Sequence, residues 1–180
     1  MPTIHRSAEV ESSRIGEGTQ IWQFVVILKN AVIGKDCNIN CHTFIENDVV
    51  IGDNVTVKSG VYLWDGLRVG DNVFIGPNAT FVNDKFPASR QRPVQFQTTV
   101  IESHVSIGAG SVILGGLKIG SYSLIGAGAV VTKDILPHSL VIGNPGRIVA
   151  YIDEAGKKLR WLDDCYISET GKKYHFKKIK

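Results

Sequence analysis

The chain has 180 residues, of which 43% are hydrophobic, and its formal net charge is +3 at pH 7. This length predicts one well-buried domain with a small appendage rather than two large domains. The modest charge disfavours nucleic-acid binding, and no apolar run approaches the roughly 18 residues of a membrane span. Because no signal peptide follows Met1, we expect a cytoplasmic protein with neither a nucleic-acid nor a membrane partner.

An aliphatic or aromatic residue recurs at every sixth position from Ile15 to Phe81. The positions are Ile15, Ile21, Ile27, Ile33, Ile39, Ile45, Ile51, Val57, Leu63, Val69, Ile75 and Phe81. Two residues before most of them stands a small or β-branched residue: Ser13, Thr19, Val25, Ala31, Cys37, Thr43, Val49, Val55, Val61, Val73 and Ala79. An α-helix of 3.6 residues per turn would spread this repeat around its whole surface, so the pattern argues against a helix.

A second period is nested in the first, because Gly16, Gly34, Gly52 and Gly70 are eighteen residues apart. Three hexads therefore form one coil, and a glycine at each recurring corner tolerates a positive φ. Successive coils are expected to stack about 4.8 Å apart, at the spacing of strands in a sheet.

The count is interrupted once, by the polar, proline-bearing stretch from Phe81 to Thr99. It resumes at Ile101, Ile107, Ile113, Ile119, Ile125 and Val131, and stops at Pro137. Phe81 and Ile101 are twenty residues apart, one coil plus two, so we expect a loop over residues 82–100.

The last segment of the chain leaves the ladder. Around Gly156 and Gly171 it predicts two short hairpins with these glycines at the turns. The three cysteines, Cys37, Cys41 and Cys165, are odd in number and form no C-x-x-C pair, so we expect packed thiols rather than a disulfide framework or a metal site.

The units V-V-I-G-D-N and V-F-I-G-P-N resemble those of the hexapeptide-repeat acyltransferases. This resemblance covers about residues 4–150 and implies an all-β fold. The implied fold is a left-handed parallel β-helix over residues 1–150, with the loop 82–100, and a C-terminal β-hairpin extension over 151–180. Some members of the family carry a zinc-ribbon-like tail at this place. Here Asp153, Ala155, Ile167 and Thr170 stand at the likely ligand positions, so we expect a metal-free cap.

Three late segments resemble the coenzyme A half of these enzymes: I-G-A-G-S-V-I (107–113), I-G-A-G-A-V-V-T-K-D-I (125–135) and V-I-G-N-P-G-R-I-V (141–149). In this family the pantetheine arm lies in a groove between neighbouring subunits of a trimer. The resemblance therefore implies acetyl-CoA as co-substrate, no metal, and a homotrimer with three intersubunit sites. The coenzyme-binding residues that it implies are Gly108, Ala109, Gly126, Ala127, Lys133, Asn144, Pro145 and Arg147. Glycines that only form corners, and cations that are only solvated, are the alternative.

The interrupting loop contains no histidine, whereas the O-acetyltransferases of this fold carry one there to deprotonate a hydroxyl. His5, His42, His104, His138 and His175 lie elsewhere and are expected at the surface or at corners. A hydroxyl needs a general base, but an amine with a pKa of roughly 8 is already partly unprotonated. The missing histidine therefore points to an amino acceptor.

The eighteen-residue spacing places Asn47, Asp65 and Asn83 at one corner of three successive coils, with Glu46 and Trp64 beside them. A solvated asparagine ladder would give the same column. The segments W-D-G (64–66), N-D-K-F-P (83–87) and R-I-G-E-G-T-Q-I-W-Q-F-V-V-I (14–27) resemble the N-acetyltransferases of nucleotide-linked 3-amino-3,6-dideoxyhexoses. More distantly, they resemble enzymes that act on 3-amino uronic acid sugars.

This resemblance implies catalytic roles for Asp65, Asn83 and Asp84. The substrate-binding residues that it implies are Glu46, Asn47, Trp64, Lys85, Phe86, Arg90 and Arg92. Arg90, Gln91 and Arg92 are candidates for the pyrophosphate because guanidinium groups match phosphate oxygens; a solvated loop is the alternative. Whether Asp65 acts as a base or only positions the amine stays open.

The implied function is acetyl-CoA-dependent acetylation of the 3-amino group of a nucleotide-linked 3-amino-3,6-dideoxyhexose, with dTDP as the expected nucleotide, for O-antigen or surface polysaccharide biosynthesis. The alternatives are an N-acetyltransferase of a UDP-linked 3-amino uronic acid, a γ-class carbonic anhydrase and a non-catalytic β-helix scaffold. The carbonic anhydrase would need three clustered histidines, which the spacing of His42, His104 and His138 does not supply. The resemblance leaves three alternatives open: the stereochemistry at C-4 of the sugar, a thymidine or a uridine nucleotide, and an acetyl or a longer acyl donor.

Overall fold

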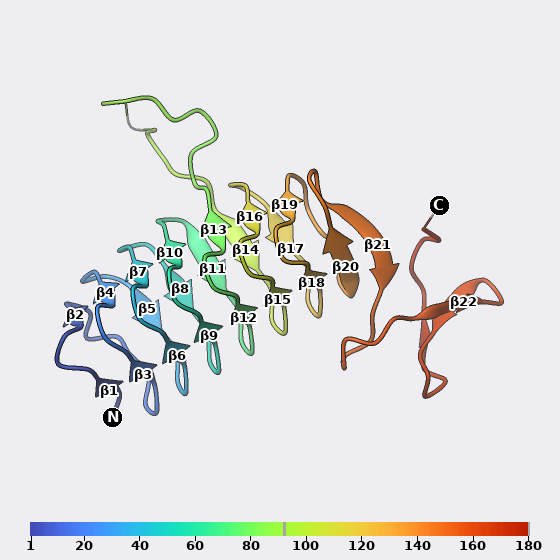
Figure 1. The fold of residues 1–180 in the computed structure, drawn as a ribbon, viewed down its shortest axis with the longest axis horizontal. Helices are drawn as coiled ribbons and strands as arrows, with labels where there is room; N and C mark the ends of the chain where they lie inside the picture. Colours follow the sequence, from blue (N-terminus) through green and yellow to red (C-terminus); the bar gives the residue numbers. More distant parts are fainter. Residues whose placement is uncertain (92, 180) are drawn as a thin grey trace.

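The chain winds into a left-handed parallel β-helix, as the resemblance to the hexapeptide-repeat acyltransferases implies. In the computed structural model, which describes residues 1–91 and 93–179, three parallel sheets form the three walls of the helix (Figure 1). Before the last coil, the strands of the walls have only two or three residues each, because each hexad supplies one outward and one inward side chain before the chain turns. The residues that the structure describes contain no helix long and apolar enough to cross a membrane.

The three walls are called sheets A, B and C. Sheet A contains β1 (Thr3–Ile4), β3 (Gln20–Ile21), β6 (Asn38–Ile39), β9 (Thr56–Val57), β12 (Phe74–Ile75), β15 (Ser106–Ile107), β18 (Leu124–Ile125), β20 (Ser139–Ile142) and β21 (Arg147–Tyr151). Sheet B contains β2 (Glu9–Val10), β4 (Val26–Ile27), β7 (Phe44–Ile45), β10 (Tyr62–Leu63), β13 (Thr80–Phe81), β16 (Val112–Ile113) and β19 (Val130–Val131). Sheet C contains β5 (Val32–Ile33), β8 (Val50–Ile51), β11 (Leu67–Val69), β14 (Thr99–Ile101) and β17 (Lys118–Ile119).

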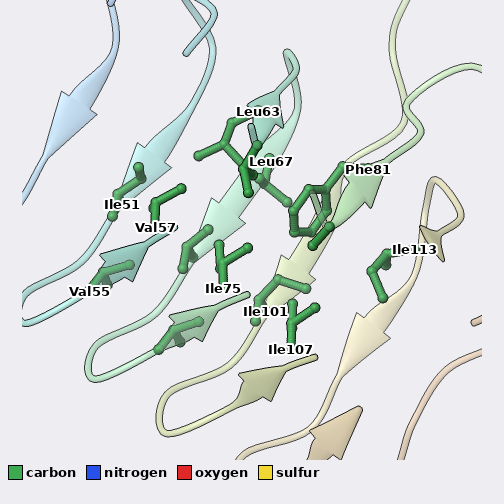
Figure 2. Close-up of a cluster of buried hydrophobic side chains, with 14 of the residues drawn as sticks. Ile51, Val55, Val57, Leu63, Leu67, Ile75, Phe81, Ile101, Ile107 and Ile113 are labelled. Carbon is green, nitrogen blue, oxygen red and sulfur yellow. The ribbon is translucent and has the colours of Figure 1, made fainter. Parts of the chain in front are cut away.

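The core follows the predicted ladder. The residues of the six-residue count from Ile21 to Ile125 are buried, and Figure 2 shows Ile51, Val57, Ile75 and Ile101 pointing into the same interior. In the first coil Ser12, rather than the expected Ser13, is buried; its hydroxyl donates to the carbonyl of Ala31 at 2.7 Å.

The interruption is a fourteen-residue insertion into one coil. Val69 pairs with Ile101 and Phe81 with Ile113, and each pair is thirty-two residues apart instead of eighteen. The inserted loop leaves the corner between sheets B and C and projects away from the coils (Figure 1). It ends earlier than expected, because the last two residues of the range 82–100 already belong to β14.

The ladder does not stop at Pro137 but shifts by two residues. Ile119 bridges Ile135 and Ile125 pairs with Val141, so the final coil has sixteen residues and these two partners are buried. The antiparallel strand β21 then turns back along β20.

The C-terminal segment forms a small antiparallel sheet of β22 (Arg160–Leu162), β23 (Cys165–Ile167) and β24 (Lys173–Tyr174). Gly156 and Gly171 lie in turns, as predicted, and have positive φ values. The sequence interpretation missed a third turn at Asp163 and Asp164, which have φ values of 46° and 61°. The expectation of a positive φ at the recurring corner glycines is wrong: Gly16, Gly34, Gly52 and Gly70 do not have one, and a Cβ on any of them would instead lie within 3 Å of the next coil.

This sheet packs around aromatic rings and is linked to the last coils. Tyr122 stacks between His104 and His138, and the ring of His138 contacts Tyr174 of β24. The expected corner positions of these two histidines are therefore confirmed, and their rings pack in this stack. Of the three free cysteines, Cys37 and Cys165 are buried and Cys41 is half-buried, and burial raises the pKa of the Cys37 thiol.

Candidate functional site

Asn47, Asp65 and Asn83 form a column at the corner between sheets B and C. The column exists because Phe44 pairs with Tyr62 and Tyr62 with Thr80, so equivalent residues recur every eighteen positions. Asn47 Oδ1 accepts the N–H of Asn30 at 3.1 Å, Asp65 Oδ1 accepts that of Asp48 at 2.6 Å, and Asn83 Nδ2 donates to the carbonyl of Asp65 at 3.1 Å. Each side chain is thus tied to the corner of the preceding coil.

Glu46 and Trp64 lie beside this column, as predicted. Glu46 Oε2 accepts the N–H of Asp65 at 2.7 Å, which fixes the peptide that carries the Asp65 side chain. The centroid of the Trp64 ring lies 5.6 Å from that of Phe44 and 5.9 Å from that of Tyr62. A polar corner with fixed geometry therefore meets an aromatic surface.

The Asp65 carboxylate has a structural duty, because one of its oxygens holds the Asp48 corner. Asp84 has a different structural role, because its Oδ1 accepts the N–H of Phe86 at 2.9 Å and shapes the start of the loop. Of the three expected catalytic residues, Asp65 and Asn83 are therefore joined by a hydrogen bond, whereas Asp84 is bonded within the loop.

The loop residues expected to bind substrate are not gathered against the column within one chain. Lys85, Phe86 and Arg90 are exposed, Phe86 to 90%, on the projecting loop (Figure 1). Arg92 lies outside the described residues. A pyrophosphate role for the arginines stays a prediction.

Gly108 and Gly126 stack at the corner between sheets A and B. A Cβ on Gly108 would lie 2.5 Å from the backbone nitrogen of Ala127, and one on Gly126 would lie 2.8 Å from Cγ2 of Ile142. The backbone of the next coil thus leaves no room for a side chain at Gly108, and the space at Gly126 is tight. Ala109 and Ala127, beside them, are exposed.

Two other glycines at this corner are open to the outside. Gly110 and Gly128 have φ values of +62° and +68°, and a Cβ on either would meet nothing within 4 Å. Sequence reasoning passed over them, although both belong to the repeated I-G-A-G unit. They leave backbone exposed where a thin ligand could approach.

The remaining expected coenzyme residues lie on both edges of sheet B. Asn144 and Pro145, joined by a cis peptide bond, belong to the turn that bonds to Val130 and continues the Gly108 edge. Arg147 follows and donates to the carbonyl of Gly146 at 3.0 Å. Lys133 is exposed at the opposite edge, in the turn after β19. One chain thus separates these groups by the width of sheet B.

The outer face of sheet B is apolar. Its outward residues are Glu9, Val26, Phe44, Tyr62, Thr80, Val112 and Val130. In the described strands of this sheet after β2, none of the outward side chains is charged. A groove of about 410 Å³ on this face is lined by Phe24, Val26, His42, Thr43, Phe44, Tyr62 and Trp64. The face connects the Asp65 corner to the Gly110 corner.

The part of the chain that the structure describes contains no group of three or more His, Cys, Asp and Glu placed to hold a metal ion. His42 lies at the corner between sheets A and B, whereas His104 and His138 lie at the corner between sheets C and A. A cluster of these three histidines is therefore not formed within one chain.

Comparison with known proteins identifies similar chains. The family model of the bacterial transferase hexapeptide, with six repeats, matches residues 12–47, 48–83 and 98–133. A dTDP-3-amino-3,6-dideoxy-alpha-D-galactopyranose 3-N-acetyltransferase of Aneurinibacillus thermoaerophilus is 50% identical over 173 residues, covering 96% of this chain and 90% of that enzyme.

Two solved structures are also similar. A hexapeptide-repeat acetyltransferase of Vibrio cholerae in complex with acetyl coenzyme A is 32% identical with a TM-score of 0.54, over 63% of this chain and 68% of that one. A mutant perosamine N-acetyltransferase of Caulobacter crescentus in complex with CoA and GDP-perosamine is 26% identical with a TM-score of 0.51. The match covers 82% of this chain and 56% of that enzyme, so this chain spans little more than half of its length.

Proposed function

The chain belongs to the bacterial transferase hexapeptide family, and we propose that it acetylates the 3-amino group of dTDP-3-amino-3,6-dideoxy-D-galactose with acetyl-CoA. The observation that carries this proposal is the 50% identity to an enzyme of that activity over 96% of the chain. The polar corner of Asp65 and Asn83 and a loop sequence without histidine are consistent with an amino acceptor.

In the proposed reaction the amine nitrogen attacks the thioester carbonyl, a C–N bond forms, and the C–S bond breaks. The leaving thiolate takes up the proton that the nitrogen loses, so the products are an amide and a thiol. No strong protein base is needed, which suits an Asp65 that is already bonded to the Asp48 corner. The protein contributes by holding the amine in position, with a backbone N–H to stabilise the oxyanion.

For acetyl-CoA we propose the edge that contains Gly108, Ala109, Gly126 and Ala127, extended to the exposed backbone at Gly110 and Gly128. Asn144, Pro145 and Arg147 would continue this site at the end of the same edge, and Lys133 would reach it from another subunit. Pantetheine amides can hydrogen-bond to such exposed backbone. The cytoplasm and surface polysaccharide biosynthesis are the proposed setting.

The decisive experiment measures thiol release from acetyl-CoA with a panel of nucleotide sugars. We expect the dTDP-linked 3-amino-3,6-dideoxygalactose to be used best, at least about tenfold better in kcat/KM than its C-4 epimer, because a misplaced hydroxyl leaves polar groups unpaired. A UDP-linked 3-amino uronic acid should be a poor acceptor. Release with none of these sugars would contradict the proposal and favour a non-catalytic scaffold.

We also propose a homotrimer, in which the apolar outer face of sheet B is covered by a neighbouring subunit. An exposed apolar face of this extent marks an interaction surface. Within one chain, sheet B separates the polar corner of Asp65 from the glycine edge of Gly108. A neighbouring subunit packed on this face would place the polar corner of one subunit beside the glycine edge of another. The sites would then lie between subunits.

The expected mass by light scattering is about 59 kDa, three times the 19.7 kDa of the chain. Val112→Arg, on the outer face of sheet B, should dissociate the trimer and abolish activity, because it buries an unpaired charge at the interface. Thr56→Arg, on the outer face of sheet A, is the matched control; this variant should remain a trimer and keep its activity. A fully active monomer would contradict the trimer.

A further inference from the structure

Gln97 occupies the same corner as Asp65 and Asn83, although it is far from both in the sequence. Thr99 pairs with Leu67, so Gln97 stands opposite Asp65, and its N–H donates to the carbonyl of Asn83 at 3.2 Å. The two residues that bound the inserted loop, Asn83 and Gln97, are therefore tied together. Asp65, Asn83 and Gln97 line one cavity at this corner.

Two glycines provide the space that Gln97 fills. A Cβ on Gly115 would lie 2.7 Å from Oε1 of Gln97, and one on Gly66 would lie 2.6 Å from its backbone oxygen. The side chain also lies within 3.5 Å of the Cβ position of Gly116. Gln97 is held between the coil above and the coil below, so its carboxamide has a defined place.

The Oε1 atom of Gln97 is buried and has no hydrogen-bond partner among residues 1–91 and 93–179. An unpaired buried acceptor destabilises a folded protein, and native structures contain few of them. Such an atom beside a candidate site calls for an explanation in terms of function. A hydrogen-bond donor from a ligand would supply one.

The space around Gln97 limits what that donor can be. A cavity of about 10 Å³ is lined by Trp64, Asp65, Leu67, Phe81, Val82, Asn83, Gln97 and Thr99. This is room for one group of about the size of a water molecule. A primary amino group fits that size, whereas a sugar ring does not.

We propose that Gln97 is a further acceptor-binding residue, whose Oε1 accepts a hydrogen bond from the amino group of the sugar. This inference rests on the proposed function. With a second N–H directed to the carboxamide oxygen of Asn83, the lone pair of the nitrogen points away from the corner and toward the thioester. A hydroxyl has only one hydrogen and cannot satisfy both acceptors. Gln97 would therefore favour an amine over a hydroxyl.

Gln97→Leu tests this role, because it keeps a similar volume and removes the acceptor. We expect kcat/KM for the amino sugar nucleotide to fall about tenfold to a hundredfold, with the KM for acetyl-CoA unchanged. The Tm should stay the same or rise, since an unpaired buried acceptor is lost. The rise in Tm on adding the sugar nucleotide should become smaller than in the wild type, and that on adding CoA should remain unchanged.

Two further variants complete the experiment. Gln97→Glu keeps an acceptor oxygen and should recover part of the activity, whereas Gln95→Leu, at an exposed loop position, should match the wild type. Unchanged kcat/KM in Gln97→Leu would overturn the inference. So would a lower Tm with equal losses for both substrates, which would show a structural acceptor. If the wild type itself releases no thiol with any sugar, the proposed function fails instead.

Discussion

Ile51→Asp is expected to lower the free energy of unfolding by at least about 4 kcal/mol, enough to leave little folded protein at 25 °C. Ile51 is 2% exposed in β8, and its side chain points into the interior formed by the three sheets (Figure 2). A carboxylate there would have no cation to pair with in an apolar core. Urea denaturation followed by circular dichroism measures the loss.

Val50→Asp is the matched control, one residue away on the same strand. Val50 is 38% exposed on the outside of sheet C and pairs with Arg68 of β11, so the new carboxylate would face a cation. We expect its stability to change by no more than about 0.5 kcal/mol. Equal melting of the Ile51 variant and the wild type would mean that the inward register is wrong.

The hexads specify the register because a two-residue strand offers only one inward position. An error of one residue would turn every aliphatic residue of the ladder outward, so the buried set from Ile21 to Ile125 could be predicted from the sequence. The last coil could not, because Ile135 and Pro137 both follow plausible spacings. The pairings of Ile119 with Ile135 and of Ile125 with Val141 show that this coil is two residues shorter.

The column of the candidate site was predictable for the same reason, since Asn47, Asp65 and Asn83 follow the eighteen-residue step. Gln97 was not, because its place opposite Asp65 becomes visible only when the insertion is known to span fourteen residues. The sequence also does not show which way a glycine faces in the fold. Gly108 faces the next coil and Gly110 faces open space, although they share one motif.

Asn83→Ala is expected to lower kcat/KM for the amino sugar nucleotide by roughly tenfold to a thousandfold, while coenzyme A binding stays near that of the wild type. The change removes the carboxamide that bonds to the Asp65 carbonyl and, in the proposed complex, orients the amine. Steady-state kinetics in both substrates, with CoA binding measured by calorimetry, separate the two effects. A parallel loss of CoA binding would indicate a disturbed fold instead.

Asp65→Asn separates positioning from base catalysis at the same corner. The new side chain keeps an oxygen that can accept the N–H of Asp48, so the coil should hold its shape while the negative charge is lost. If Asp65 only positions the amine, kcat/KM should stay within about tenfold of the wild type, and its pH profile should follow the substrate amine. If Asp65 is the base, activity should fall by a further factor of about a hundred, and an acid-limb pKa should vanish from the profile. We expect the first result, because the carboxylate already holds a corner and the departing thiolate can take the proton. Near-wild-type kinetics in both the Asn83 and the Asp65 variants would place the amine elsewhere and remove this column from the mechanism.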